Sequence, residues 1–142
     1  MTITRNAKAH WEGSLFEGKG QVKLESSGLG SFDVTWASRA EDPNGRTSPE
    51  ELLAAAHSSC FNMQLSNVLV KAGNEAQSID TSAEVDFKPG TGITEIRLTV
   101  RAKVEGLDND AFVTAAEAAK TGCPVSQALR ATPIKLDAAL AE

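Results

Sequence analysis

The segment from Ser48 to Gly73 constrains the fold most, because it predicts a single long helix with signals at both ends. Ser48 is a suitable N-cap, Pro49 fits the first helical position, and Glu51 completes a capping-box pattern. Gly73 is a typical residue just past the end of a helix, and no glycine or proline lies between Pro49 and Gly73. We therefore expect one helix over 48–73, around which the rest of the chain is organised.

The middle of this predicted helix is unusually small-sided. Residues 54–59 are alanine and serine apart from His57, and Cys60 follows them. Small side chains let another backbone come close or leave room for a ligand. Cys60 has two interpretations at this stage: a reactive thiol, which needs access and a lowered pKa, or a buried small hydrophobic residue. His57 lies three residues before Cys60 on the same helix face and could polarise the thiol, although a packing or surface role is the commoner one for a helical histidine.

Length and composition predict one domain over residues 1–142 with a packed interior. The chain has 142 residues, of which 41% are hydrophobic, and a net charge of −5. That charge, and the absence of any basic run, argue against a nucleic-acid partner. The longest apolar run, Leu52 to Ala56, is too short to cross a bilayer, and the first 13 residues lack the apolar core of a signal peptide. We therefore expect a cytoplasmic protein without membrane association.

Alternating apolar residues predict an α+β fold rather than a repeated βαβ unit. The expected elements, in chain order, are strands over 6–14, 18–26 and 31–38, a polar loop over 39–47, the long helix, strands over 78–88 and 93–104, a helix from Asp108 or Asp110 to Lys120, a short helix from Val125 to Arg130, and a strand from Ile134 to Leu140. The first three strands, joined by short turns, suggest an antiparallel meander.

Cys123 is the second cysteine of the chain and lies in a Gly-Cys-Pro break before the short helix. The N–H groups and dipole of a helix start favour a thiolate there. With only two cysteines, a redox or nucleophilic role is more plausible in a cytosolic protein than a structural disulfide. The pair suits a thiol cycle in which one sulfur becomes a sulfenic acid and the other condenses with it. No cysteine or histidine pair has the spacing of common zinc sites, so we expect no metal.

Arg39 and Glu50 are the charged candidates for the same chemistry. Arg39 follows the third predicted strand and could stabilise a thiolate or a peroxide oxygen, while Glu50 could hold it by a bidentate pair. On position alone, a solvated loop arginine and a first-turn glutamate that complements the helix dipole are the plainer interpretations. Glu50 and Cys60 are ten residues apart, about 15 Å along a straight helix. Either the helix is interrupted, or Glu50 of one chain meets Cys60 of another across a close helix crossing in a symmetric dimer.

Two segments resemble the OsmC/Ohr family of bacterial hydroperoxide reductases: 48–61, SPEELLAAAHSSCF, and 121–129, TGCPVSQAL. The segments 9–13 and 78–81, together with His57 and the CPVSQ sequence, look like the OsmC branch. The resemblance implies an intertwined homodimer of α+β fold, with an antiparallel sheet, a long central helix and two active sites at the interface. It implies that Cys60 is the peroxidatic cysteine, Cys123 the resolving cysteine and Glu50 the site glutamate. Arg39 matches the site arginine best, with Arg46 of the same loop as the alternative.

The function expected from this resemblance is a thiol-dependent peroxidase for organic hydroperoxides, with hydrogen peroxide as a further candidate substrate. Cys60 would attack the peroxide, Cys123 would close a disulfide, and an external dithiol would reset the pair. No metal or organic cofactor is expected, because the thiols supply the electrons. Two alternatives stay open: a redox-sensing or ligand-binding thiol module without rapid turnover, and a purely structural dimer module.

Overall fold

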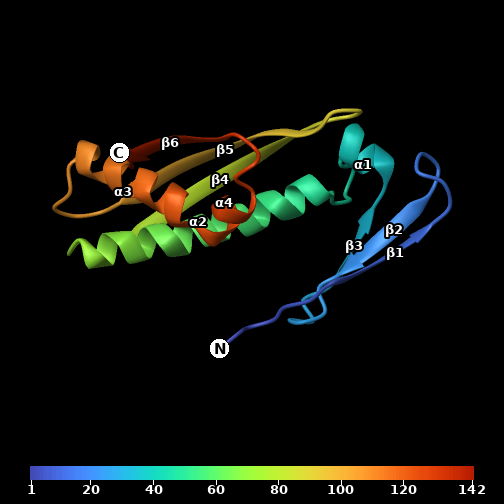
Figure 1. Ribbon diagram of the computed structural model, residues 1–142, viewed down its shortest axis with the longest axis horizontal. Helices are drawn as coiled ribbons and strands as arrows, with labels where there is room; N and C mark the ends of the chain where they lie inside the picture. The colour runs from blue at the N-terminus through green and yellow to red at the C-terminus, as the bar shows by residue number, and fades with distance from the viewer. The chain divides into compact units, whose positions relative to one another are not determined.

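The computed structural model describes residues 1–142, which form six strands and four helices (Figure 1). In chain order they are β1 (Lys8–Glu12), β2 (Lys19–Lys23), β3 (Ser31–Val34), α1 (Trp36–Ala40), α2 (Pro49–Lys71), β4 (Ser78–Lys88), β5 (Gly92–Lys103), α3 (Asn109–Gly122), α4 (Pro124–Ala128) and β6 (Ile134–Leu140). The chain divides into two compact units, Met1–Leu52 and Leu53–Glu142. The predicted α+β class is confirmed. None of the helices combines the length and the apolar character that crossing a bilayer would require.

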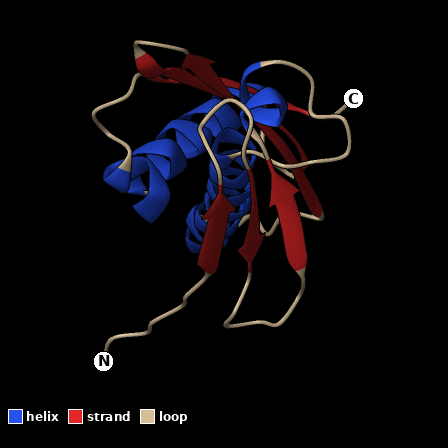
Figure 2. Ribbon diagram, turned by 90° about the vertical axis from the view of Figure 1, so that its right-hand side faces the viewer, coloured by secondary structure: helices blue, strands red, loops and turns tan.

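The first unit contains a three-stranded antiparallel sheet in the order β1-β2-β3, whose strands are drawn as red arrows in Figure 2. The meander predicted from the sequence is confirmed, but its third strand was expected to reach residue 38 and ends at Val34. Thr35 caps α1 instead. Its side chain accepts a hydrogen bond from the Ser38 N–H, and the Ser38 hydroxyl accepts one from the Thr35 N–H. This capping box overrides the alternating pattern and turns Trp36 and the residues after it into a short helix.

The second unit contains a sheet in the order β4-β5-β6 (Figure 1). β4 and β5 form an antiparallel hairpin, whereas β6 runs parallel to β5. The prediction of an antiparallel sheet is therefore wrong for this pair. The reason is the connection: α3 and α4 carry the chain back along the sheet before β6 begins, and such a crossover joins parallel strands.

The core of the second unit lies between α2, α3 and the strand β5. It is formed by apolar side chains that are fully buried or nearly so: Phe61, Leu65 and Leu69 from α2, Ile96, Leu98, Val100 and Ala102 from β5, and Phe112, Ala116 and Ala119 from α3. The β5 residues alternate along the strand, so they share one face of the sheet. Both helices therefore pack on that same face.

Helix α2 runs without interruption over 23 residues. The Ser48 hydroxyl accepts a hydrogen bond from the Glu51 N–H, as the capping pattern predicts, and Gly73 adopts the left-handed φ of +88° that a side chain would disfavour. The helix is apolar on more than its buried side, because Met63 and Val70 are exposed by 73% and 53%. Helix α2 therefore has apolar side chains on its exposed side as well as on the side that packs in the core.

Candidate active site

Folding brings the two cysteines into contact. Cys60 lies in the middle of α2, and Cys123 lies between α3 and α4, where it ends one helix and caps the next. Their Sγ atoms are 3.1 Å apart although 63 positions separate them in the sequence, and both are free thiols. A covalent disulfide has a sulfur separation of about 2.05 Å. A movement of about 1 Å would therefore suffice to join them.

The N-terminal turn of α4 contacts Cys60. The backbone N–H of Val125 donates a hydrogen bond to Cys60, and this contact favours the thiolate. From the sequence, the start of this helix was expected to favour a thiolate at Cys123. The structure differs because Cys60 is packed against the first turn of α4, while Cys123 is the buried N-cap of that helix.

The pKa of the Cys60 thiol is nevertheless raised. Burial is the largest cause, and the hydrogen bond and charge of Cys123 act in the same direction, against the Val125 N–H. None of the groups that shift this pKa is a cation. The lowered pKa that a reactive thiol needs is thus not supplied by the groups around Cys60 in the second unit.

Arg39 and Glu50 form a bidentate ion pair within the first unit. Arg39 Nε lies 2.9 Å from Glu50 Oε1, and Arg39 Nη2 lies 2.9 Å from Oε2. The Glu50 side chain is only 8% exposed and that of Arg39 is 30% exposed. α1 presents the arginine, since the Thr35 cap turns the chain into this helix, and the first turn of α2 presents the carboxylate. The pairing fixes the planes of both groups.

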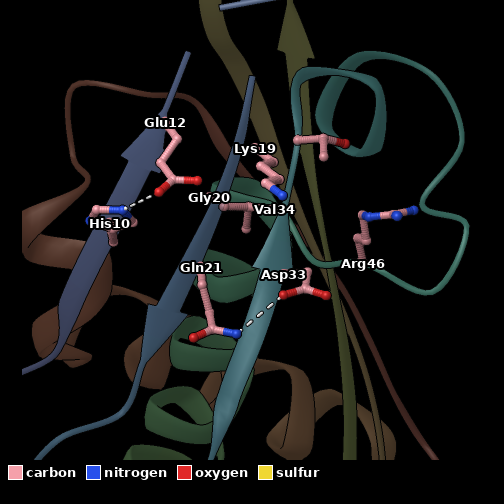
Figure 3. A pocket seen from close by; sticks show the side chains of 9 residues that line it. His10, Glu12, Lys19, Gly20, Gln21, Asp33, Val34 and Arg46 are labelled. Carbon is pink, nitrogen blue, oxygen red and sulfur yellow. Dashed lines mark hydrogen bonds and ion pairs between the residues drawn. The ribbon is translucent and has the colours of Figure 1, made fainter. Parts of the chain in front are cut away.

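Arg46, the other arginine of the loop, lies elsewhere in the first unit. It lines a groove of about 360 Å³ on the polar side of the β1-β2-β3 sheet (Figure 3). Side chains of both charge signs line the same groove: His10, Glu12, Lys19 and Asp33. His10 Nε2 lies 3.4 Å from Glu12 Oε1, and the groove contains no cysteine. Of the two candidates, only Arg39 is paired with Glu50.

His57 does not bond to Cys60. Its Nε2 lies 2.7 Å from the hydroxyl oxygen of Ser126 on α4, and its Nδ1 is buried without a hydrogen-bond partner. Burial lowers the pKa of His57. The hypothesis of a Cys–His pair is therefore wrong. The sequence assigned no role to Ser126, although this residue lies in the CPVSQ segment that resembles the OsmC branch.

Comparison with known proteins settles the family. The family model described as OsmC-like protein matches residues 42–138. The chain belongs to this family. It is 44% identical over 134 residues to Peroxiredoxin OsmC of Escherichia coli (strain K12), covering 92% of this chain and 93% of that protein, and equally similar to the protein of the same name from Shigella flexneri. The resemblance seen in the sequence is confirmed.

A solved structure extends the comparison from sequence to fold. The chain is similar to the organic hydroperoxide resistance protein OhrB of Bacillus subtilis, with 26% sequence identity and a TM-score of 0.69. The match covers 96% of this chain and 98% of that one. The OsmC family fold therefore extends over almost all of the chain, including both cysteine segments.

Proposed function

We propose that this protein is a cysteine-based peroxidase that reduces organic hydroperoxides through Cys60 and Cys123. The observation that carries the proposal is the 3.1 Å contact between two free sulfurs from distant parts of the sequence. Membership of the OsmC family supports it. So do the printed names of the relatives, a peroxiredoxin in Escherichia coli and an organic hydroperoxide resistance protein in Bacillus subtilis.

The reaction would proceed in two steps that leave both cysteines oxidised. The Cys60 thiolate attacks one peroxide oxygen, the O–O bond breaks, the alcohol leaves with a proton, and Cys60 becomes a sulfenic acid. Cys123 then attacks the Cys60 sulfur, water leaves, and a disulfide forms. Two thiols thus supply the two electrons that reduce the peroxide, so no metal or organic cofactor is required. An external dithiol restores both thiols by exchange and is itself oxidised.

We assign Arg39 the task of stabilising the Cys60 thiolate and the leaving oxygen, with Glu50 fixing its orientation. Two observations support this assignment. The pKa of Cys60 is raised, and no cation contributes to it, so a cation from elsewhere would be needed for thiolate formation at neutral pH. The Arg39–Glu50 pair is bidentate and holds the guanidinium in one plane, as an electrostatic catalyst requires.

The continuous helix α2 leads us to propose a homodimer. Ten residues of unbroken helix separate Glu50 from Cys60 by about 15 Å along the axis. An interrupted helix, one of the two solutions left open by the sequence, is excluded. In the remaining solution the Arg39–Glu50 pair of one chain would serve Cys60 of its partner.

The outward side of α2 offers a surface for such a dimer. Four of its exposed residues recur at helical spacing and are small or apolar, with the polar Asn67 among them: Ala56, Ser59, Met63 and Val70. Small residues near the middle allow two helices to cross closely. The first unit also exposes large apolar side chains, among them Trp11 and Phe32, each by 41%. Apolar surface of this kind is typical of a subunit interface.

Peroxide consumption in the presence of dithiothreitol tests the proposed function. We expect the protein to consume many equivalents of cumene hydroperoxide per chain, and the Cys60→Ser variant to consume none above the uncatalysed rate. Oxidation of one equivalent without further consumption would favour the redox-sensing alternative. A Cys60 that does not react with hydroperoxide at all would leave only a structural role.

We also propose that the enzyme works in the cytoplasm. The net charge of −5 and the short apolar runs support a cytoplasmic enzyme without nucleic-acid or membrane partners.

A further inference from the structure

We propose that His57 and Ser126 are positioning residues, whose hydrogen bond holds the two cysteines in register for disulfide closure. The inference rests on the thiol cycle proposed above and adds two residues to it. His57 precedes Cys60 by three residues on α2, and Ser126 follows Cys123 by three residues on α4. The histidine–serine bond and the sulfur–sulfur contact therefore tie together the same two segments, about one helical turn apart.

The bond is protected from water. His57 is 0% exposed and Ser126 is 5% exposed. The imidazole has no contact with solvent, so loss of the Ser126 hydroxyl would leave its ring nitrogen unsatisfied. The lowered pKa of His57 keeps its imidazole neutral near pH 7, with a single N–H.

The unpaired ring nitrogen indicates which way the bond runs. If Nδ1 carried the proton, a buried N–H would lack any acceptor, because Nδ1 has no partner. Orphaned N–H groups are rarer in folded proteins than orphaned acceptors. We therefore place the proton on Nε2, which donates to the Ser126 hydroxyl oxygen. A residue needed only to fill this space could be apolar and would avoid the unpaired nitrogen, so packing alone is a poor reason for an imidazole here.

Helix α4 needs an anchor of this kind because it is only five residues long. A helix of that length has few internal hydrogen bonds to fix its position. Its start carries Cys123, and its Val125 N–H contacts Cys60, so a shift of α4 would misalign the attack of one sulfur on the other. Intramolecular reactions depend steeply on alignment, and a misplacement of about 1 Å can cost about 100-fold in rate.

The two steps of the cycle should therefore respond differently when the bond is lost. Neither His57 nor Ser126 is hydrogen-bonded to Cys60, so peroxide attack should be little affected. Disulfide closure should slow, and the Cys60 sulfenic acid should persist. A second hydroperoxide would then oxidise it to the sulfinic acid and be reduced to the alcohol.

The test compares Ser126→Ala and His57→Leu, which remove the bond, with Ser126→Thr and His57→Gln, which keep a hydroxyl or an amide N–H in its place. Ser58→Ala is the matched control, because the Ser58 hydroxyl bonds only to backbone oxygens within α2. Each protein receives one equivalent of cumene hydroperoxide with dimedone present. Mass spectrometry then measures the disulfide and the dimedone adduct of Cys60 over time.

For Ser126→Ala and His57→Leu we expect disulfide closure about 10- to 100-fold slower and a matching rise in dimedone adduct. The rate of thiol loss in the first step should stay within about twofold, and the conservative variants should restore closure. Wild-type closure rates in both disruptive variants would overturn the inference while leaving the peroxidase proposal intact. Equal slowing of both steps would overturn it too, as a sign of general disruption. Ser126→Ala removes only one oxygen, so it keeps the test decisive if His57→Leu does not fold. If hydroperoxide does not oxidise Cys60 in the wild-type protein, both the proposed function and this inference are refuted.

Discussion

Replacing Glu50 by glutamine tests the Arg39 ion pair with little change in shape. The amide oxygen of the glutamine can still accept from Arg39 Nε, as Oε1 does now at 2.9 Å. Its NH₂ group, however, would face Arg39 Nη2, where a carboxylate oxygen now accepts at 2.9 Å. Two donors would then point at each other, so one charge-assisted hydrogen bond is lost.

The size of the effect follows from this geometry. A hydrogen bond to a charged group contributes about 1.5–3 kcal/mol. Arg39 is 30% exposed and can regain part of this from water, so we expect the free energy of unfolding to fall by about 1–2 kcal/mol. For a chain of this length that corresponds to a decrease in Tm of about 3–8 °C. Under the proposed mechanism, a loosened guanidinium should also lower kcat/KM for cumene hydroperoxide by about 10- to 100-fold.

Thermal unfolding and steady-state peroxide consumption measure the two effects, with Glu51→Gln as the control. Glu51 neighbours Glu50 in the first turn of α2 but is exposed, and an amide oxygen could still accept from the Thr47 hydroxyl. We expect Glu51→Gln to change stability by less than about 0.5 kcal/mol and to leave kcat/KM unchanged. Equal Tm values for the two variants would refute the stabilising pair. A Glu50→Gln variant with full kcat/KM would refute the catalytic role of the pair.

Three further predictions follow from other parts of the structure. Cys123→Ala removes the hydrogen bond and the charge of Cys123, both of which raise the pKa of Cys60, while burial, the largest cause, remains. Iodoacetamide should therefore alkylate Cys60 faster at pH 7 than in the wild type. An unchanged alkylation rate would contradict this. Met63→Lys places a charge on the exposed stripe of α2 and should convert the proposed dimer to monomer in light scattering, whereas a dimer of undiminished stability would exclude this face as the interface. The hydrogen bond and charge of Arg97 hold the pKa of Asp86 below its usual value. The pair therefore stabilises the fold fully above about pH 4, and this stabilisation is lost as the pH falls through the lower pKa that Asp86 has in the folded protein. Urea unfolding of Arg97→Gln should show a shallower loss of stability between about pH 5 and pH 2, and identical slopes would count against the linkage.

Local signals in the sequence were enough to predict the long helix. Ser48, Pro49 and Gly73 act through contacts within a few residues, so their effect can be read from the chain itself. The end of the third strand could not be read in this way. Its apolar alternation continues to Trp36, and only the reciprocal bonds of Thr35 and Ser38 show that a helix begins there.

Long-range features were harder to predict. The parallel pairing of β6 depends on the path of α3 and α4, which no alternating pattern encodes. Spacing alone could not place Cys60 beside Cys123 either; the expectation that they pair came from their being the two cysteines of the chain and from the family resemblance. The contact between His57 and Ser126 joins residues 69 positions apart, so it required the fold.

The central claim, a two-electron thiol cycle, is tested most directly by counting thiols and mapping peptides after addition of one equivalent of cumene hydroperoxide per chain. We predict that two thiols disappear together and that the peptides of Cys60 and Cys123 become joined by a disulfide within one chain. Loss of Cys60 alone, or a disulfide between different chains, would contradict it.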